Sequence, residues 1–219
     1  MKTIPEASVT LTGITPLMMD NIRGADPEYD LTKRIKTITA KGVRMTPADL
    51  EQKLLLQCRS GIYEDGDRLI YPCINIMRSF QEGASGLGGG KRSLRPSVER
   101  GVLAAEATIP LRYGVRRKEE KLEDVIHSNI REFMDDTRFQ DKRVVNGNPS
   151  GGRNKAMVLA MRPIFPEWEM TLTVRVFPDM ISTEDFERAA DAGGKAGVGA
   201  GRHIGMGRYV TKVKWKSLS

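Results

Sequence analysis

Residues suited to binding an anionic ligand are concentrated near the C-terminus of this 219-residue chain. Between Gly193 and Arg208, seven glycines are interspersed with Lys195, Arg202 and His203. Glycine adopts positive φ angles and lets the backbone approach a bulky ligand, and N–H groups exposed in such a loop form concavities that bind anions. The cations would then neutralise phosphates, while the ring of His203 could stack on a base or be an ordinary loop residue.

A flexible connector is the alternative interpretation of this segment. It accounts for the glycines, but it accounts less well for the absence of any acidic residue after Asp191. The predicted RNA-binding residues of the segment are Gly193, Gly194, Lys195, Gly197, Gly199, Gly201, Arg202, His203, Gly205, Gly207 and Arg208.

Two further loops combine glycine with positive charge. The stretch from Gly83 to Pro96 contains Lys91 and Arg92, and a second stretch beginning at Gly147 contains Arg153 and Lys155. Such loops are either simple flexible surface segments or segments that become ordered on binding. Three of them in one small chain favour wrapping around a polyanion over enclosing a small molecule, so these four cations are also predicted to contact RNA.

The charge balance points the same way. Lysine and arginine number 35 against 28 acidic residues, which gives a net charge of +7 and an isoelectric point near 9.5. Segregated basic stretches are typical of proteins that bind polyanions. Because only 6% of residues are aromatic, recognition of the backbone is favoured over a platform on which bases stack.

Composition also excludes several classes of protein. No run of about 18 apolar residues could span a membrane, and the N-terminus lacks the apolar segment of a signal peptide. Two cysteines, Cys58 and Cys73, cannot form a disulfide scaffold. The sequence therefore predicts a reduced, cytoplasmic protein without membrane contact.

No enzyme motif is complete. The sequence lacks a Walker A loop, a dinucleotide fingerprint, a nucleophile elbow and a zincin helix. Cys58 is predicted to be a small core residue or a half-exposed residue, and His127 a surface residue. No cofactor and no metal site are predicted.

The elements that position these residues can be outlined from periodicity and turn chemistry. Strands are predicted at 7–13, 102–113 (interrupted at a proline), 139–145, 156–164, 170–177 and 209–216, with a short hairpin over 62–71. Helices are predicted from Thr46, from Pro72 and from Ser182, the last ending near Ala192. In the second of these helices, Ile74, Met77 and Phe80 are spaced like a buried face. The segment 32–45 is ambiguous between a short strand and an arm.

The two ends of the chain carry a family resemblance. An opening strand runs into Gly-Ile-Thr-Pro-Leu, and a late strand and helix lead to Gly-Val-Gly-Ala-Gly-Arg-His-Ile-Gly-Met-Gly-Arg-Tyr, residues 197–209. This arrangement resembles the RAMP superfamily of CRISPR-associated proteins, in particular the backbone subunits that polymerise along a guide RNA. The resemblance implies an α+β fold, a ferredoxin-like (RRM-like) antiparallel sheet with helices on one face. It also implies one domain over 1–219 with insertions near 20–45, 83–101 and 139–164.

Further roles follow only from this resemblance. The hairpin over 139–164 is similar to the thumb of such subunits, and Met157, Val158, Leu159 and Met161 would be its apolar wedge or ordinary strand core. Relatives that cleave a target use an aspartate in an early loop, which makes Asp20 and Asp26 candidates by position.

Three functions are therefore compatible with the sequence. The first is a non-catalytic subunit that oligomerises on single-stranded, crRNA-like RNA together with other effector subunits in antiviral defence. The second is a metal-dependent subunit that cleaves target RNA. The third is a single-stranded DNA-binding or annealing protein of a phage or mobile element, which a preference against the 2′-hydroxyl would reveal.

Overall fold

A computed structural model of the chain describes residues 4–66, 68–88, 93–114, 130–147 and 156–216. The helices are α1 (Asp30–Thr39), α2 (Pro47–Ser60), α3 (Cys73–Ala84), α4 (Arg95–Gly101), α5 (Ile130–Asp135) and α6 (Thr183–Ala196). The strands are β1 (Glu6–Gly13), β2 (Leu17–Met18), β3 (Glu64–Asp65), β4 (Arg68–Pro72), β5 (Val102–Ala104), β6 (Thr108–Pro110), β7 (Arg112–Gly114), β8 (Gln140–Gly147), β9 (Ala156–Phe165), β10 (Glu167–Val176) and β11 (Tyr209–Trp215).

The chain divides into two compact units. Unit 1 comprises Met1–Leu17, Glu64–Ile126 and Phe165–Ser219, and unit 2 comprises Met18–Tyr63 and His127–Ile164. Unit 2 thus consists of two insertions into the sequence of unit 1. The interpretation of residues 1–219 as a single domain stays a prediction.

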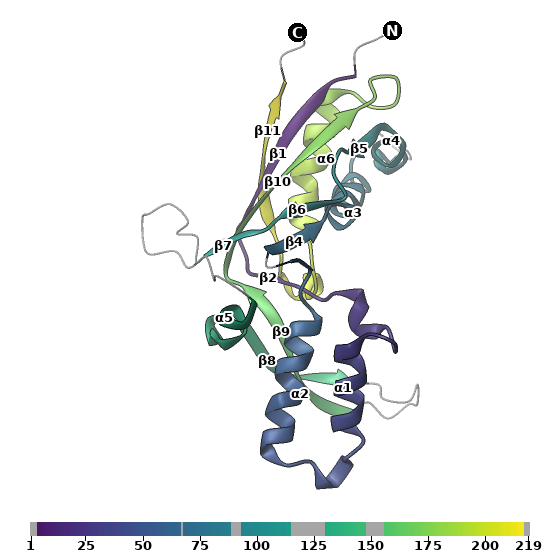
Figure 1. Cartoon of the computed structure of the whole chain (residues 1–219). Coiled ribbons are helices and arrows are strands. Elements are labelled where there is room, and N and C mark those ends of the chain that lie inside the picture. The colour runs from purple at the N-terminus through teal and green to yellow at the C-terminus, as the bar shows by residue number, and fades with distance from the viewer. Residues whose placement is uncertain (1–3, 67, 89–92, 115–129, 148–155, 217–219) are drawn as a thin grey trace. The chain divides into compact units, whose positions relative to one another are not determined.

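The main sheet of unit 1 has the strand order β11-β1-β10-β5, and β7 also pairs with β10. All of these pairs are antiparallel. Along the chain the elements follow as β1, α3, β5, β10, α6 and β11, with β1 and β5 separated in the sheet by β10 (Figure 1). This split βαβ arrangement is the ferredoxin-like fold, so the predicted α+β fold class is confirmed.

One side of this sheet forms the core of unit 1. Alternation along β1 buries Ala7, Val9 and Leu11, because successive side chains of a strand point to opposite faces. Helices α3 and α6 cover this side, and the rings of Phe80 and Phe186 meet edge to face with centroids 5.9 Å apart. The predicted strands at the two ends of the chain and at 170–177 are thereby confirmed.

The middle of unit 1 departs from the prediction in two places. The single strand expected over 102–113 is three short strands, β5, β6 and β7, since β5 and β7 pair with separate stretches of β10 whereas β6 pairs with β4. Ile74, expected in the buried face of α3, is 59% exposed, whereas Ile76 is buried. The hairpin between β3 and β4 is confirmed, with Gly66 at φ +59° in its turn.

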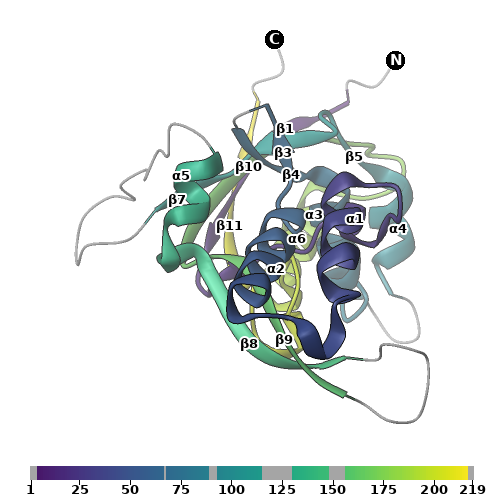
Figure 2. The ribbon, with the colours of Figure 1, turned by 60° about the horizontal axis from the view of Figure 1, so that its bottom comes forward.

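Helices α1 and α2 of unit 2 lie side by side (Figure 2). Thr46 caps α2 as predicted, in a reciprocal capping box with Asp49. The ambiguous segment 32–45 is neither a strand nor an arm, because most of it is helix α1. Leu31, Ile35 and Ile38 recur at helical spacing and pack in one small core with Leu56 of α2.

The predicted long hairpin is also in unit 2. Strands β8 and β9 pair in the register Val144↔Leu159, and β2 joins them beside β9. Residues 148–155, predicted to be the basic tip, lie outside the described residues.

Candidate nucleic-acid interface

Helix α6 begins as the sequence predicts, with the Ser182 hydroxyl accepting from the N–H of Asp185 at 3.0 Å. It ends at Ala196, beyond the predicted end near Ala192. Gly193 and Gly194 therefore belong to the helix and are buried, and the prediction that the loop starts at Gly193 is wrong. A Cβ on Gly194 would lie 2.1 Å from the carbonyl oxygen of Tyr209, so this glycine permits close packing of α6 against β11.

A buried hydrogen-bond network holds the base of the loop. The Ser79 hydroxyl of α3 donates to the carbonyl of Gly193 at 2.8 Å and lies 2.8 Å from the Tyr209 hydroxyl. Burial raises the pKa of Tyr209 above its usual range, so its hydroxyl stays neutral. Neither the sequence pattern nor the spacing pointed to Ser79, because its role depends on contacts between distant segments.

The segment from Gly197 to Arg208, here called the G loop, has a defined conformation. Its glycines at 197, 199, 201, 205 and 207 all have positive φ, from +69° to +87°. A Cβ on Gly207 would lie 1.8 Å from the carbonyl oxygen of Val198, and the N–H of Val198 donates to the carbonyl of Gly207 at 2.9 Å. The glycines thus allow the first and last residues of the loop to approach closely. A flexible connector, the alternative interpretation of this segment, would not require such an approach.

The G loop is fastened to the turn that follows β1. The Gly207 N–H donates to Pro16 O at 2.8 Å, and the Ile14 N–H donates to Arg208 O at 2.8 Å. The Arg208 N–H donates to the Thr15 hydroxyl at 2.8 Å. The two segments that carry the RAMP resemblance are therefore hydrogen-bonded neighbours in space.

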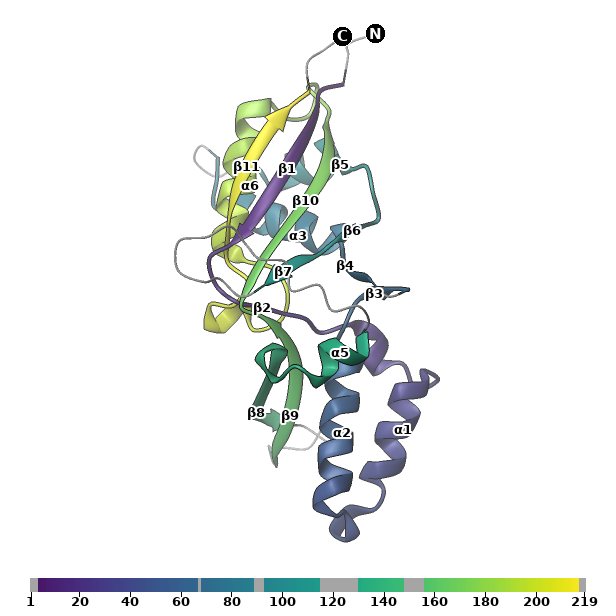
Figure 3. The same ribbon diagram turned by 60° about the vertical axis from the view of Figure 1, so that its left-hand side comes forward.

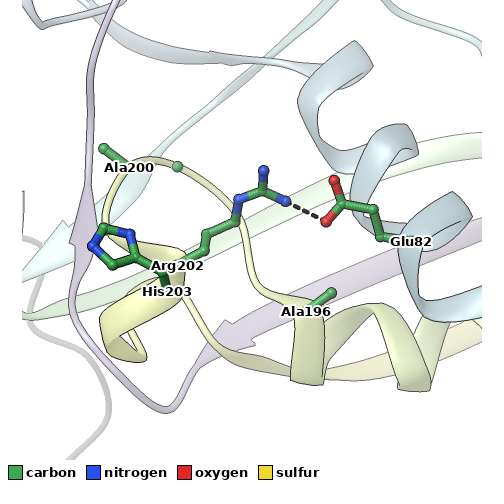
Figure 4. Close-up of a pocket in the computed structure, with 7 residues that line it drawn as sticks. Glu82, Ala196, Ala200, Arg202 and His203 are labelled. Carbon is green, nitrogen blue, oxygen red and sulfur yellow. Dashed lines mark hydrogen bonds and ion pairs between the residues drawn. The ribbon is translucent and has the colours of Figure 1, made fainter.

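An open hollow of about 520 Å³ lies between the G loop and α3. Figure 4 shows Arg202 directed toward Glu82 of α3, with which it forms an ion pair, and His203 directed the other way. Arg202 remains 40% exposed and Glu82 43% exposed. The residues lining the hollow are Glu82, Ala196, Gly199, Ala200, Gly201, Arg202 and His203.

Positive charge continues on both sides of the loop. Lys195 is exposed on the last turn of α6. Arg208 is exposed where the loop meets β11, and Lys212 and Lys214 are exposed along that strand. The structure therefore brings together the predicted cations Lys195, Arg202 and Arg208, and adds Glu82 and Thr15, which the sequence did not indicate.

The other predicted site residues lie either outside the described residues or in unit 2. Lys91, Arg92, Arg153, Lys155 and His127 are outside the described residues. In unit 2 the Asp20 carboxylate lies 3.4 Å from the Arg162 guanidinium, and the Asp26 carboxylate accepts from the N–H of Glu28 at 2.9 Å. Within the described residues, no three His, Cys, Asp or Glu side chains are grouped as metal ligands.

The wedge residues of the hairpin differ in exposure. Met161 is buried at 6% and Val158 is 37% exposed, while Leu159 is half-buried. The side chain of Met157 lies outside the described part of the chain.

Both cysteines are buried, which is the first of the two alternatives predicted for Cys58. Burial, and then the charge of Asp141, raises the pKa of the Cys58 thiol to about 12. No helix among the described residues is long and apolar enough to cross a membrane.

No protein-family model and no curated protein matches this sequence. Among solved structures, one similar chain comes from "Cryo-EM structure of the Type III-B Cmr-beta bound to cognate target RNA", with 12% identity and a TM-score of 0.48. The match covers 97% of this chain and 60% of the other, so this chain spans about three-fifths of that chain's length. Another is "Crystal structure of Cmr6 from Pyrococcus furiosus", with 14% identity, a TM-score of 0.37 and coverage of 97% and 100%. These values describe similarity of backbone arrangement and do not show what the present chain binds.

Proposed function

We propose that this chain is an RNA-binding subunit of a CRISPR-type ribonucleoprotein. The observation that carries the proposal is the G loop, a structured glycine loop with exposed Arg202, His203 and Arg208. Positive charge at a surface where the backbone is accessible suits the phosphates of a nucleic acid. In this proposal the subunit acts in the cytoplasm beside other effector subunits.

The proposal includes oligomerisation without catalysis. Copies of the subunit bind head to tail along one single-stranded guide RNA, because a shared strand raises the effective concentration of each neighbour. Among the described residues, the contacts of Asp20 and Asp26 do not indicate a nuclease site. No feature of the described surface favours binding of DNA over binding of RNA.

The first experiment is co-purification. The expressed protein is sized before and after treatment with RNase or DNase, and the absorbance ratio at 260 and 280 nm is recorded. A large species that collapses with RNase alone supports the proposal. Collapse with DNase alone supports the DNA-binding alternative, and a nucleic-acid-free monomer that binds no added strand contradicts both.

The site itself is tested with Arg202→Gln combined with Arg208→Gln. We expect weaker binding to every RNA sequence, with the slope of log Kd against log salt reduced by about 1.4, since each phosphate contact on a single strand contributes about 0.7. The matched control removes two arginines from the helix-covered side of unit 1, Arg78→Gln with Arg188→Gln. An unchanged slope in the G-loop variant would show that the loop is not the phosphate site.

A further inference from the structure

Unit 1 has a second polar surface, on the side of the main sheet that α3 and α6 do not cover (Figure 3). Side chains that alternate with the buried Val9 and Leu172 and with the half-buried Val213 point to this side. We call the central part of it the open face, defined by Ser8, Thr10, Thr171, Thr173, Lys212 and Lys214. Each of these residues is half-buried or exposed.

The strand register arranges the open face in two rows. Thr10 lies opposite Lys212 on one side and Thr171 on the other, and the hydroxyl oxygens of Thr10 and Thr171 are 3.0 Å apart. Ser8 lies opposite Lys214 and Thr173 in the same way. Each row therefore presents one ammonium group and two hydroxyl groups to solvent.

The acidic residues of the flanking rows, Glu6 and Glu169, are already paired, and at the β5 edge of the sheet the Glu106 carboxylate accepts from the Thr173 N–H at 3.2 Å. Glu6 accepts from both Lys216 and Arg175, and Glu169 lies 2.8 Å from Arg112. In the part of the chain that the structure describes, neither Lys212 nor Lys214 forms an ion pair. The centre of the open face thus carries two uncompensated positive charges.

We propose that the open face binds the sugar–phosphate backbone of a single-stranded nucleic acid, an inference that rests on the proposed function. Lysines and hydroxyl side chains are groups that contact phosphate and sugar, and the charge of the surface is complementary to that backbone. None of the six residues that define the face is aromatic, so it offers no platform for stacking and would not select among bases.

Continuity with the G loop supports this occupant. Arg208 ends the loop, and Lys212 and Lys214 follow at alternate positions of the same edge strand. Alternate residues of a β-strand are about 7 Å apart, so a nucleic-acid strand leaving the G loop at Arg208 would pass the exposed Val210 and then meet Lys212 and Lys214 in succession along β11.

The test compares the wild-type protein with purified variants by fluorescence anisotropy, using oligouridine and oligothymidine over a range of salt concentrations. In Lys212→Gln combined with Lys214→Gln, we expect the salt slope to fall by about 1.4 and the affinity at about 0.1 M salt to fall roughly 25-fold. Arg78→Gln with Arg188→Gln is the matched control for net charge. Thr171→Lys, which adds a cation to the open face, should strengthen binding.

Several results would overturn the inference. The first is an equal loss of affinity for the oligonucleotide in the open-face variant and in the control. The second is unchanged affinity in the open-face variant while the G-loop variant binds more weakly. The third is a change in the self-association of the open-face variant in the absence of nucleic acid. The second of these leaves the proposed function standing. Failure of the wild-type protein to bind either strand instead removes the proposed function itself.

Discussion

At the scale of single residues, Glu82 is the most informative position near the G loop. Its carboxylate pairs with Arg202, the cation that would contact a phosphate in the proposed function. The pair holds the guanidinium in place but also adds a negative charge beside the hollow. A phosphate entering there would compete with Glu82 for Arg202.

Replacing Glu82 with Gln tests this competition. We expect binding of single-stranded RNA to become roughly twofold to fivefold tighter at low salt, because an exposed ion pair contributes up to about 1 kcal/mol. The control is Glu99→Gln, which removes an exposed acid on α4. Weaker binding by the Glu82→Gln variant would mean that Glu82 helps to form the site by orienting Arg202.

At the scale of elements, the close approach of α3, α6 and β11 sets the position of the G loop. A Cβ on Gly83 would lie 2.2 Å from the backbone nitrogen of Gly193, and one on Gly194 would meet the Tyr209 carbonyl. These are contacts with backbone atoms, which cannot rotate away. The three elements therefore have to separate if either glycine gains a side chain.

The variant Gly194→Ala should destabilise unit 1 by about 1–3 kcal/mol, the usual cost of overpacking a core. For a chain of this size that lowers the melting temperature by roughly 2–4 °C per kcal/mol, measured by circular dichroism. Gly86→Ala is the control, because a Cβ there meets nothing within 4 Å. An unchanged melting temperature for Gly194→Ala would contradict the packing described for α6.

The cap of helix α2 leads to a prediction about how the stability of the folded protein depends on pH. A hydrogen bond from Lys41, followed by those from Thr46, lowers the pKa of Asp49 from 3.8 to about 2. Because the folded-state pKa is below the unfolded value, this stabilisation is complete above pH 3.8 and is lost as the pH falls toward about 2. Asp49→Asn should show a smaller loss of melting temperature across that window than the wild type, and equal losses would argue against the capping role.

At the scale of the whole molecule, assembly distinguishes a filament subunit from a solitary binding protein. If copies bind side by side, the number of copies per strand should rise in proportion to the length of an oligouridine. Light scattering of saturated complexes measures this number. One copy on strands of every length would refute the oligomeric part of the proposal while leaving RNA binding intact.

The local features of this protein could be predicted from its amino-acid sequence. Capping residues placed the starts of α2 and α6, alternation identified β1 and β10, and the glycine and arginine content singled out residues 193–208. Each of these signals is contained within a few neighbouring residues, so it can be recognised without knowledge of the fold. The same local patterns did not predict helix α1 or the correct end of α6. The conformation there depends on packing of α1 against α2 and of α6 against β11.

Contacts between residues far apart along the chain could not be predicted in this way, because they depend on the complete fold. The pairing of Glu82 with Arg202, the attachment of the G loop to Thr15 and the contact of Ser79 with Tyr209 join segments far apart along the chain. The open face is of the same kind, since Ser8, Thr173 and Lys214 become neighbours only through strand register. Periodicity shows which side of a strand is polar, but the order of strands in the sheet depends on burying the whole core at once.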